Sequence, residues 1–408
     1  MMKGCSRLRQ FVMGSMASVG ILLVAAGCQS TEKAPVRSDG IRAIWVTRWD
    51  FKTEDDVKRI MRESKNSGFN TVLFQVRGNG TVQYRSPFEP WSVEFNGRDP
   101  GFDPLSVACR EAHKRGLSLH AWVNVMPGWR GKEPPTDPRQ LYRARADWFW
   151  RDANGHRQPL GWYNSVNPCY PEVRRYLTDV IGDIVARYEV DGIHLDYIRF
   201  PNEWNDSYPK GAVVPDYPRD PRTIDMFRQA TGQTPDSAPG VWKQWRADQV
   251  TQLVRQIRSR IKRMEPQVKL SAAVGAVPDR SREAYFQDSV QWMRENLLDA
   301  VYPMNYAADL PMYDQQLDIW QRLRPRIPVV MGIMFVDRTP DLVKSQIAST
   351  SRTGAHFAAF AYNGLFERRD LAGKKLNDGS SASRAALRRY VLPIIRRQKQ
   401  DGFQMAQR

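Results

Sequence analysis

The chain has 408 residues, of which 41% are hydrophobic and 26% charged, a composition that excludes a disordered or fibrous protein. Its 61 Lys and Arg side chains against 44 Asp and Glu give a formal net charge of +17. Such a charge attracts nucleic acid in a cytosolic protein, but anionic glycans and phospholipid surfaces in an exported one. The first residues indicate export, so we expect no nucleic-acid partner. Solvated outer helix faces would give the same basic excess.

The N-terminus has the layout of an export signal. Basic residues precede an apolar run over residues 11–26, shorter than the roughly 20 residues that a bilayer-spanning helix needs. Small residues then lead into Cys28, so residues 1–27 resemble a bacterial lipoprotein signal that is cleaved before a lipidated Cys28. No Asp follows Cys28, which implies the outer membrane of a Gram-negative cell, facing the periplasm, with residues 28–40 as a tether. An ordinary signal peptide or a retained membrane anchor is the alternative.

Two further cysteines, Cys109 and Cys169, remain in the exported chain. They could form one disulfide in an oxidising compartment. Equally, Cys109 lies where a helix would face the core, and a small buried apolar residue is a common role for cysteine. Two cysteines are too few for a metal cluster, and the five His residues include no pair at zinc-binding spacing. We therefore expect neither a metal nor a cofactor.

From residue 41 onward, short apolar runs alternate with amphipathic helical patterns. The runs are mostly continuous, as is typical of parallel strands covered on both faces. We predict strands over residues 41–49, 71–77, 118–125, 192–200, 269–275, 300–306, 328–335 and 355–362. We predict helices over residues 54–67, 104–115, 172–188, 242–264, 282–296, 313–322, 341–353 and 383–391.

Eight such units favour an α/β fold, a single-domain (β/α)8 TIM barrel over residues 41–392, with a basic tail over residues 393–408. A doubly wound sheet would carry a glycine-rich turn after its first strand, and the sequence has none there. The loops after strands 2, 3 and 4 are long and rich in Trp, Tyr, Pro and Gly. Barrel active sites are built from loops at this end of the strands, so we predict that these loops form the walls of a cleft. Surface insertions are the alternative.

The most informative segment covers residues 190–201, VDGIHLDYIRFP. His194, Asp196 and Ile198 share one face of the predicted strand, which points into the barrel mouth near the strand's end. A carboxylate there is costly unless it is paired or used in chemistry. We predict that Asp196 is catalytic. A buried structural Asp, paired with His194 or Arg199, is the alternative.

Five other motifs accompany this segment, at residues 75–77, 90–92, 112–116, 120–124 and 166–168. Together they resemble the bacterial glycosyl-hydrolase-like family 10, and the resemblance runs from about residue 41 to residue 366. It implies a TIM barrel with glycosidase-type chemistry on a cell-wall or capsular glycan. The resemblance therefore implies a polysaccharide as the partner of the predicted cleft.

The sequence departs from related patterns at one point. Many members of that family carry two consecutive Asp residues where this chain has Asp196 and Tyr197, so only Asp196 is carried over. The spacing is also similar to the fourth-strand motif of family 18 chitinases, but their general-acid Glu would fall at Ile198. In α-amylase-type barrels a carboxylate in this place is the nucleophile, which supports Asp196 by analogy.

Glycoside hydrolysis normally needs two carboxyl groups, and the sequence does not identify the partner of Asp196. The candidates near strand ends are Glu203, Asp279 and Asp309, and further ones are Glu89 and Glu94. Aromatic faces stack on sugar rings, while Asn, His and Arg side chains donate to hydroxyls and carboxylates. On this basis the predicted substrate-binding residues are Arg77, His120, Trp122, Asn124, His194, Arg199 and Tyr306. Aromatic residues that we expect to add to the mouth are Trp45, Trp49, Trp148, Trp150, Trp162 and Tyr163.

The leading hypothesis is a glycosidase acting on peptidoglycan strands, because a basic barrel tethered to the outer membrane would face that anionic polymer. A catalytically silent barrel that binds glycan and organises the wall is the alternative, and it would be favoured if no second carboxylate lay near Asp196. A polysaccharide deacetylase or lyase is a third hypothesis, although a deacetylase usually needs metal ligands that this sequence lacks.

Overall fold

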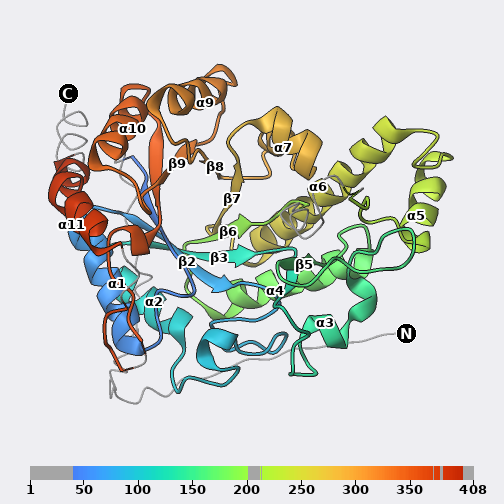
Figure 1. Ribbon diagram of the computed structural model, residues 1–408, viewed down its shortest axis with the longest axis horizontal. Coiled ribbons are helices and arrows are strands. Elements are labelled where there is room, and N and C mark those ends of the chain that lie inside the picture. Colours follow the sequence, from blue (N-terminus) through green and yellow to red (C-terminus); the bar gives the residue numbers. More distant parts are fainter. Residues whose placement is uncertain (1–39, 201–211, 213, 371, 377–379, 398–408) are drawn as a thin grey trace, which may run out of the picture. The chain divides into compact units, whose positions relative to one another are not determined.

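The computed structural model describes residues 40–200, 212, 214–370, 372–376 and 380–397. Eight parallel strands form a nearly closed barrel with the helices outside it, so the predicted TIM barrel is confirmed (Figure 1). The strands are β1 (Arg42–Val46), β2 (Thr71–Arg77), β3 (Ser118–Asn124), β6 (Gly192–Asp196), β7 (Lys269–Gly275), β8 (Ala300–Met304), β9 (Val330–Met334) and β10 (His356–Phe360). Around the barrel their order is β8-β7-β6-β3-β2-β1-β10-β9, and an isolated parallel bridge between Val301 and Val329 joins its two ends.

Each predicted helix has a counterpart outside the barrel. These helices are α1 (Glu54–Asn66), α2 (Pro104–His113), α4 (Pro171–Arg187), α6 (Pro239–Met264), α7 (Pro278–Tyr285), α8 (Ser289–Arg294), α9 (Leu310–Arg322), α10 (Pro340–Arg352) and α11 (Ser381–Tyr390). The helix predicted over residues 282–296 is in fact two helices. Phe286 adopts a left-handed conformation, with φ of 53°, and ends α7, so the chain turns before α8 begins.

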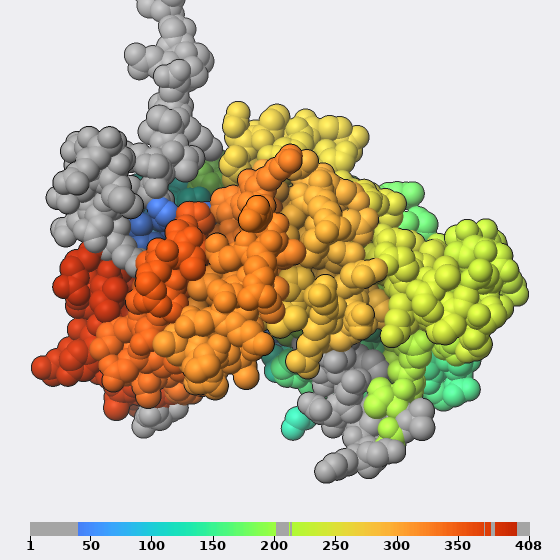
Figure 2. All heavy atoms as spheres, turned by 90° about the horizontal axis from the view of Figure 1, so that it is seen from above, coloured from blue at the N-terminus to red at the C-terminus, as the bar shows by residue number. Residues whose placement is uncertain are grey.

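The long loops hold structure that the sequence did not predict. The loop after β3 forms an antiparallel ribbon of β4 (Pro127–Arg130) and β5 (Tyr163–Ser165), together with α3 (Leu141–Ala144) and a 3-10 turn, η2 (Ala146–Trp148). The 3-10 turns η1 (Val93–Phe95) and η4 (Tyr362–Gly364) follow β2 and β10, and α5 (Pro221–Thr231) lies between β6 and α6. In Figure 1 the arrows of β2 and β3 point toward the end occupied by β5, α3 and α5. Figure 2 shows α5 and the first turns of α6, in yellow-green, at the right-hand end of the visible surface.

Several helices have a capping side chain followed by a proline at the first or second helical position. Asp103 accepts hydrogen bonds from the N–H groups of Leu105 and Ser106 and so starts α2. Asp309 does the same for α9 by accepting from the N–H of Met312 at 2.8 Å. Such caps satisfy backbone donors that the helix itself leaves unpaired. The role of Asp309 in the structure is therefore that of an exposed helix cap.

The alternation of side chains along the strands divides the hydrophobic core in two. A cluster inside the barrel includes Trp45, Leu73, Trp122 and Tyr302, one from each of four strands. The larger cluster fills the space between the outer strand faces and the helices. Because inward positions alternate with outward ones, His194 and Asp196 both point inward, and they lie at successive levels of the interior.

At the base of the barrel, acidic residues that precede strands bind neighbouring strands. Asp191 accepts from the N–H of Leu119 at 2.8 Å, and Asp299 accepts from the N–H of Leu270 at 2.8 Å. Both carboxylates thus satisfy backbone donors at the N-terminal ends of β3 and β7. Asp191 is a structural residue, although it belongs to the most informative motif of the sequence.

The two cysteines are buried free thiols in the structure, and burial raises the pKa of Cys109 to about 12. The chain stays packed beyond residue 392, because Ile395 is fully buried and Arg396 donates to the backbone oxygen of Asn66 at 2.8 Å. Among the helices of the described residues, none combines the length and the apolar character needed to cross a bilayer. The export signal and Glu203 lie outside the described residues.

Two histidines are buried inside the barrel in the neutral state. His194 accepts from the Nε1–H of Trp45 at 3.1 Å and lies 3.0 Å from the hydroxyl of Ser271, so its Nδ1 carries the proton. Burial holds the pKa of His194 well below 6.5, and the neighbouring His120 adds to this effect. Burial also lowers the pKa of His120 to about 4.

The buried histidines predict that stability decreases in mild acid. Below pH 6.5 these histidines are protonated in the unfolded chain but remain neutral in the folded chain. The free energy of unfolding therefore decreases as the pH falls from 6.5 toward 4. Each histidine contributes a slope of up to about 1.4 kcal/mol per pH unit. Denaturant unfolding of the wild type and of His120→Gln between pH 7 and 4.5 measures the slopes. We expect a shallower slope for the variant; identical slopes would contradict the assignment.

Candidate active site

Asp196 lies at the C-terminal end of β6, where the barrel opens. Its carboxylate accepts from the Nε1–H of Trp122 at 3.1 Å and from the N–H of Tyr197 at 2.7 Å. Asn124 of β3 stands directly opposite Asp196 in the strand register. The predicted grouping of Asp196, Trp122 and Asn124 is thus present at the mouth. Two donors from different parts of the chain orient one carboxylate, which is a requirement for positioned catalysis.

Tyr197 turns the chain sharply as it leaves β6. Its φ of 46° lies in the left-handed region, which a residue with a side chain adopts at a cost of about 1–2 kcal/mol. The turn places its ring edge-to-face with Tyr163, with centroids 4.8 Å apart. Tyr163 belongs to β5, so this contact brings the β4–β5 ribbon against the strand end that carries Asp196.

Tyr306 lies on the other side of the mouth, after β8. Its ring packs against Phe360 with centroids 5.2 Å apart. Burial raises the pKa of Tyr306 well above 10, and the negative charges of Asp196 and Tyr197 raise it further. The phenol therefore stays protonated and can donate a hydrogen bond beside Asp196. Its position agrees with the predicted role of a sugar-contacting tyrosine.

A polar network joins the mouth to the loop after β2. The hydroxyl of Tyr163 lies 3.3 Å from Nη1 of Arg48 and 3.4 Å from Nδ2 of Asn124. Arg48 in turn donates from Nε to Oε1 of Glu94 at 3.0 Å. Oε2 of Glu94 and Oδ1 of Asn124 are buried and have no hydrogen-bond partner within the described residues. Unsatisfied buried acceptors are rare in proteins, so these two oxygens mark the network as a candidate functional feature.

Aromatic rings surround a second arginine at the same mouth. The guanidinium of Arg130 lies 4.5 Å from the ring centroid of Trp162, 5.4 Å from that of Tyr163 and 5.8 Å from that of Trp49. Arg48 lies 4.0 Å from the ring of Trp49. The expectation that Trp49, Trp162 and Tyr163 contribute to the mouth agrees with this arrangement. Sequence reasoning did not identify Arg48 or Arg130. Arg48 follows β1, which ends at Val46, and Arg130 belongs to a ribbon that the sequence did not predict.

Two other aromatic residues of the same loop pack elsewhere. Trp150 is almost fully buried against Phe200, with centroids 4.6 Å apart, and Trp148 packs on Tyr176 of α4. Trp45 is buried in the barrel interior beneath the mouth. These three rings belong to the scaffold.

The structure corrects the interpretation of Arg77 as a substrate ligand. Its guanidinium is fully buried and binds both carboxylate oxygens of Glu89, at 2.8 Å and 2.7 Å. It also donates to the backbone oxygens of Asn124, Val125 and Pro127. Arg77 therefore ties the loop after β2 to the loop after β3, and Glu89, as its partner, is removed from the catalytic candidates.

The two histidines of the predicted binding set are corrected in the same way. His194 is fully buried, and its two ring nitrogens are engaged by Trp45 and Ser271. His120 is almost fully buried and stands opposite Gly192, at the base of β6. Both point into the barrel as predicted, but below the level at which a substrate could reach them.

The remaining predicted residues are distributed over the mouth and the surface. The half-buried guanidinium of Arg199 lies 4.7 Å from the ring of Tyr197 and 4.9 Å from that of Tyr285. Asp279 is exposed in the first turn of α7, and Asp309 is the exposed cap of α9. Among the described candidates for a second carboxyl group, Glu94 is therefore the one connected to the mouth.

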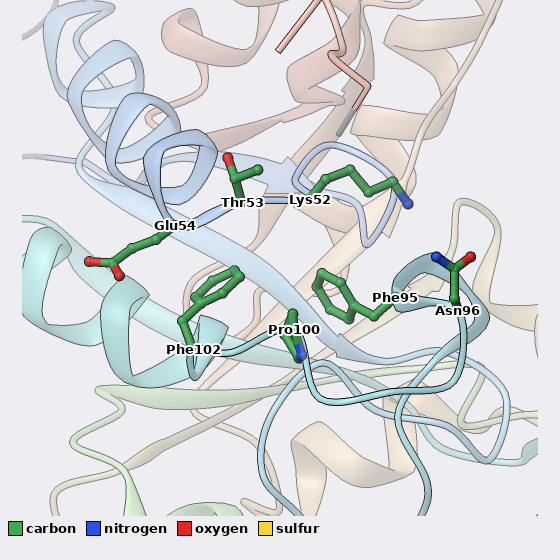
Figure 3. A pocket seen from close by; sticks show the side chains of 7 residues that line it. All are labelled: Lys52, Thr53, Glu54, Phe95, Asn96, Pro100 and Phe102. Carbon is green, nitrogen blue, oxygen red and sulfur yellow. The ribbon is translucent and has the colours of Figure 1, made fainter. Parts of the chain in front are cut away.

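A hollow of about 350 Å³ lies beside the network rather than over Asp196. Its lining residues are Lys52, Thr53, Glu54, Phe95, Asn96, Pro100 and Phe102 (Figure 3). Figure 3 shows the rings of Phe95 and Phe102 on its wall, while the carboxylate of Glu54 points away from Lys52. The ammonium group of Lys52 donates to the backbone oxygen of Glu94 at 2.9 Å, which fixes the loop that carries this residue. We regard the hollow as the outer side of the active-site wall.

Comparisons with known proteins agree with this geometry. Residues 40–336 match the model of the family described as glycosyl hydrolase-like 10. The chain is similar to glycosyl hydrolase DigH of Escherichia coli K12, with 27% identity over 81% of this chain and 85% of that protein. DigH of E. coli O6:H1 is 29% identical over 66% of this chain, and the match spans 62% of that protein's length. YngK of Bacillus subtilis, also described as a glycosyl hydrolase, is 27% identical over 72% of this chain and 60% of its own.

Solved structures show the same fold at low sequence identity. The glycoside hydrolase domain of PgaB from Bordetella bronchiseptica has a TM-score of 0.61 and 14% identity, covering 85% of this chain and 98% of that domain. The catalytic domain of β-amylase from Paenibacillus polymyxa has a TM-score of 0.61 and 10% identity, covering 88% of this chain and 99% of that chain. Both are likenesses of fold.

The geometry of Arg77 predicts a structural phenotype. We expect Arg77→Met to lower the free energy of unfolding by about 3–5 kcal/mol, because Glu89 would be left as an uncompensated buried charge. Denaturant unfolding monitored by tryptophan fluorescence measures the loss. The double variant Arg77→Met with Glu89→Gln serves as the control and should recover part of it. An unchanged unfolding midpoint with a raised KM would instead restore Arg77 to the substrate site.

Proposed function

This chain belongs to the glycosyl hydrolase-like 10 family, and on that premise we propose that it hydrolyses glycosidic bonds in peptidoglycan strands of the cell envelope. The observation that carries the proposal is the position of Asp196. Its carboxylate stands at the mouth of a glycosidase-type barrel, oriented by Trp122 and Tyr197 and faced by the protonated phenol of Tyr306. This is where barrel enzymes place catalytic residues.

Glycoside hydrolysis divides its chemistry between two carboxyl groups. One donates a proton to the departing oxygen, and the other attacks the anomeric carbon or activates water. We assign the second role to Asp196, because its two hydrogen-bond donors hold it in place for attack. We assign the first to Glu94, since one of its oxygens is bonded to Arg48 and the other is buried without a partner in the described part of the chain.

The chemistry of the mouth supports a glycan as substrate. Tyr197, Tyr306 and Trp162 supply ring faces for sugars, while Asn124 and Arg130 supply polar groups. The choice of peptidoglycan rests on the net positive charge and on the lipoprotein-like N-terminus. We propose that Cys28 carries a lipid which attaches the protein to the outer membrane, with the barrel in the periplasm.

A catalytically silent glycan-binding protein is the second candidate. Tyr197 stands where many relatives of this chain would be expected to carry a second Asp, and Asp279 and Asp309 are exposed away from Asp196's hydrogen-bond network. If Glu94 serves only to pair with Arg48, the mouth would retain its glycan contacts without a general acid. Hydrolysis assays separate the two candidates.

We expect Asp196→Asn to lower kcat on purified peptidoglycan strands by at least about a thousandfold, because the charge that stabilises an oxocarbenium-like transition state is lost. Glycan binding and the melting temperature should stay close to those of the wild type, since Asn keeps the shape of the side chain. Mass analysis of the released fragments measures hydrolysis. Asp309→Asn is the matched control and should remain active, because Asn also caps helices.

The same assay tests the partner carboxyl group. Glu94→Gln should also lower kcat sharply, while substrates with good leaving groups should regain part of the rate because they need less protonation. Full activity of Asp196→Asn together with a lowered melting temperature would make Asp196 a structural residue. If the wild type binds strands but releases no fragments, the silent barrel replaces the enzyme.

The proposed anchor has its own test. Cys28→Ala should leave the protein as unprocessed precursor or release it into the soluble fraction, because no thiol is present to accept the lipid. Fractionation of cells that express the wild type and the variant, followed by immunoblotting, measures the distribution. Replacement of Cys169, which is buried inside the domain, is not expected to alter partitioning. Membrane partitioning that is unchanged in Cys28→Ala would rule the anchor out.

A further inference from the structure

Arg130 lies at the mouth of the barrel and has no anionic partner among the residues that the structure describes. Within the described residues its guanidinium makes ring contacts only, to Trp162, Tyr163 and Trp49. It ends β4 and is half-buried. By contrast, the buried arginines Arg48 and Arg77 are each paired with a glutamate. A guanidinium carries five N–H donors, so Arg130 has donors available to a ligand.

The surroundings of Arg130 supply another donor but no negative charge that would neutralise it. Nε1 of Trp162 is buried and has no acceptor among the described residues. Arg48 stacks on Trp49 as well, but its guanidinium is engaged by Glu94 at 3.0 Å. Counted over the described residues, this cluster therefore carries one uncompensated positive charge, together with unsatisfied N–H groups. Such a cluster is suited to an anionic ligand.

The cluster adjoins Asp196 through two aromatic rings. Tyr163 lies 5.4 Å from the guanidinium of Arg130 on one side and 4.8 Å from the ring of Tyr197 on the other. Tyr197 directly follows Asp196 and donates its N–H to the carboxylate. A glycan chain whose bond is held at Asp196 would therefore place a neighbouring sugar near Arg130, with Trp49 and Trp162 as walls.

We propose that Arg130, Trp49 and Trp162 form a subsite for a sugar that bears a carboxylate, next to the sugar that is cleaved. The proposal rests on the proposed function and specifies the chemistry of its substrate. The planar fork of a guanidinium matches a carboxylate with two parallel hydrogen bonds, and the indole faces match the apolar face of a sugar ring. The carboxylate supplies the negative charge that the cluster lacks, and it accepts from the N–H groups that have no partner.

The test compares two forms of one substrate: peptidoglycan strands freed of their peptides, whose lactyl carboxylates are exposed, and the same strands after reduction of these carboxylates to alcohols. A hydrogen bond between charged groups contributes about 1.5–3 kcal/mol. We therefore expect wild-type kcat/KM to be roughly 10- to 100-fold lower on the reduced strands. Arg130→Gln should show the same loss on carboxylated strands, mainly through KM, and little change on reduced strands.

Two further variants make the comparison specific. Arg130→Lys keeps the charge but not the fork, so its KM should lie between those of the wild type and Arg130→Gln. Arg389→Gln is the matched control, because Arg389 is also stacked on an aromatic ring, at 5.3 Å from Tyr390, but lies exposed on α11. Its kinetics should equal those of the wild type on both substrates.

Binding separates a failure of this inference from a failure of the proposed function. Quenching of tryptophan fluorescence gives Kd for both forms of the strands, even if no fragment is released. Tighter binding of the carboxylated form that disappears in Arg130→Gln supports the subsite, whether or not the protein is an enzyme. Equal Kd values for both forms in the wild type overturn it. A phosphorylated oligosaccharide that binds more tightly than its carboxylated counterpart would overturn the assignment to a carboxylate.

Discussion

The buried ion pair between Arg77 and Glu89 is the interaction on which the rest of the active-site wall depends. The side chains of both residues are completely buried, and the guanidinium also binds backbone oxygens where β3 passes into the ribbon. A pair of this kind contributes little net stability, but the loss of either partner is costly because a charge would remain buried. It therefore acts mainly as a geometric constraint. It holds the loop that carries Glu94 and the ribbon that carries Arg130 in one fixed relation to β2 and β3.

Beneath that wall the barrel interior is kept free of charge. His194, between the indole N–H of Trp45 and the hydroxyl of Ser271, is locked in one neutral tautomer. Tyr302 packs edge-to-face on both His194 and Trp45. Asp196 therefore lies next to a layer of neutral rings in the barrel interior, and hydrogen-bond donors at the mouth hold its carboxylate. Such a surrounding has a low local dielectric constant, so fixed donors such as the indole of Trp122 act strongly on the carboxylate.

The fold was largely predictable from the sequence, but the level at which each inward-facing side chain lies in the barrel was not. The apolar runs placed all eight strands within a few residues, since continuous hydrophobicity marks strands covered on both faces. The β4–β5 ribbon was missed because it is short and held by tertiary contacts such as that of Arg130 with Tyr163. Alternation correctly put His194 and Asp196 on the inner face, but periodicity cannot tell the core from the mouth. Asp309 was misread because a capping Asp and a catalytic Asp both follow strands in the sequence.

The arginines of the mouth show why net charge alone does not locate a binding site. Several buried guanidinium groups are neutralised where they lie, as Arg77 is by Glu89 and Arg246 is by Asp216. These arginines add to the count of basic residues but add little positive electrostatic potential at the mouth. Arg130 differs because aromatic faces, not carboxylates, surround it. Cation–π contacts stabilise the charge without removing its N–H donors, so the attraction remains available to a ligand. In the proposed subsite the position of this one charge, rather than the excess over the whole chain, is what would attract an anion.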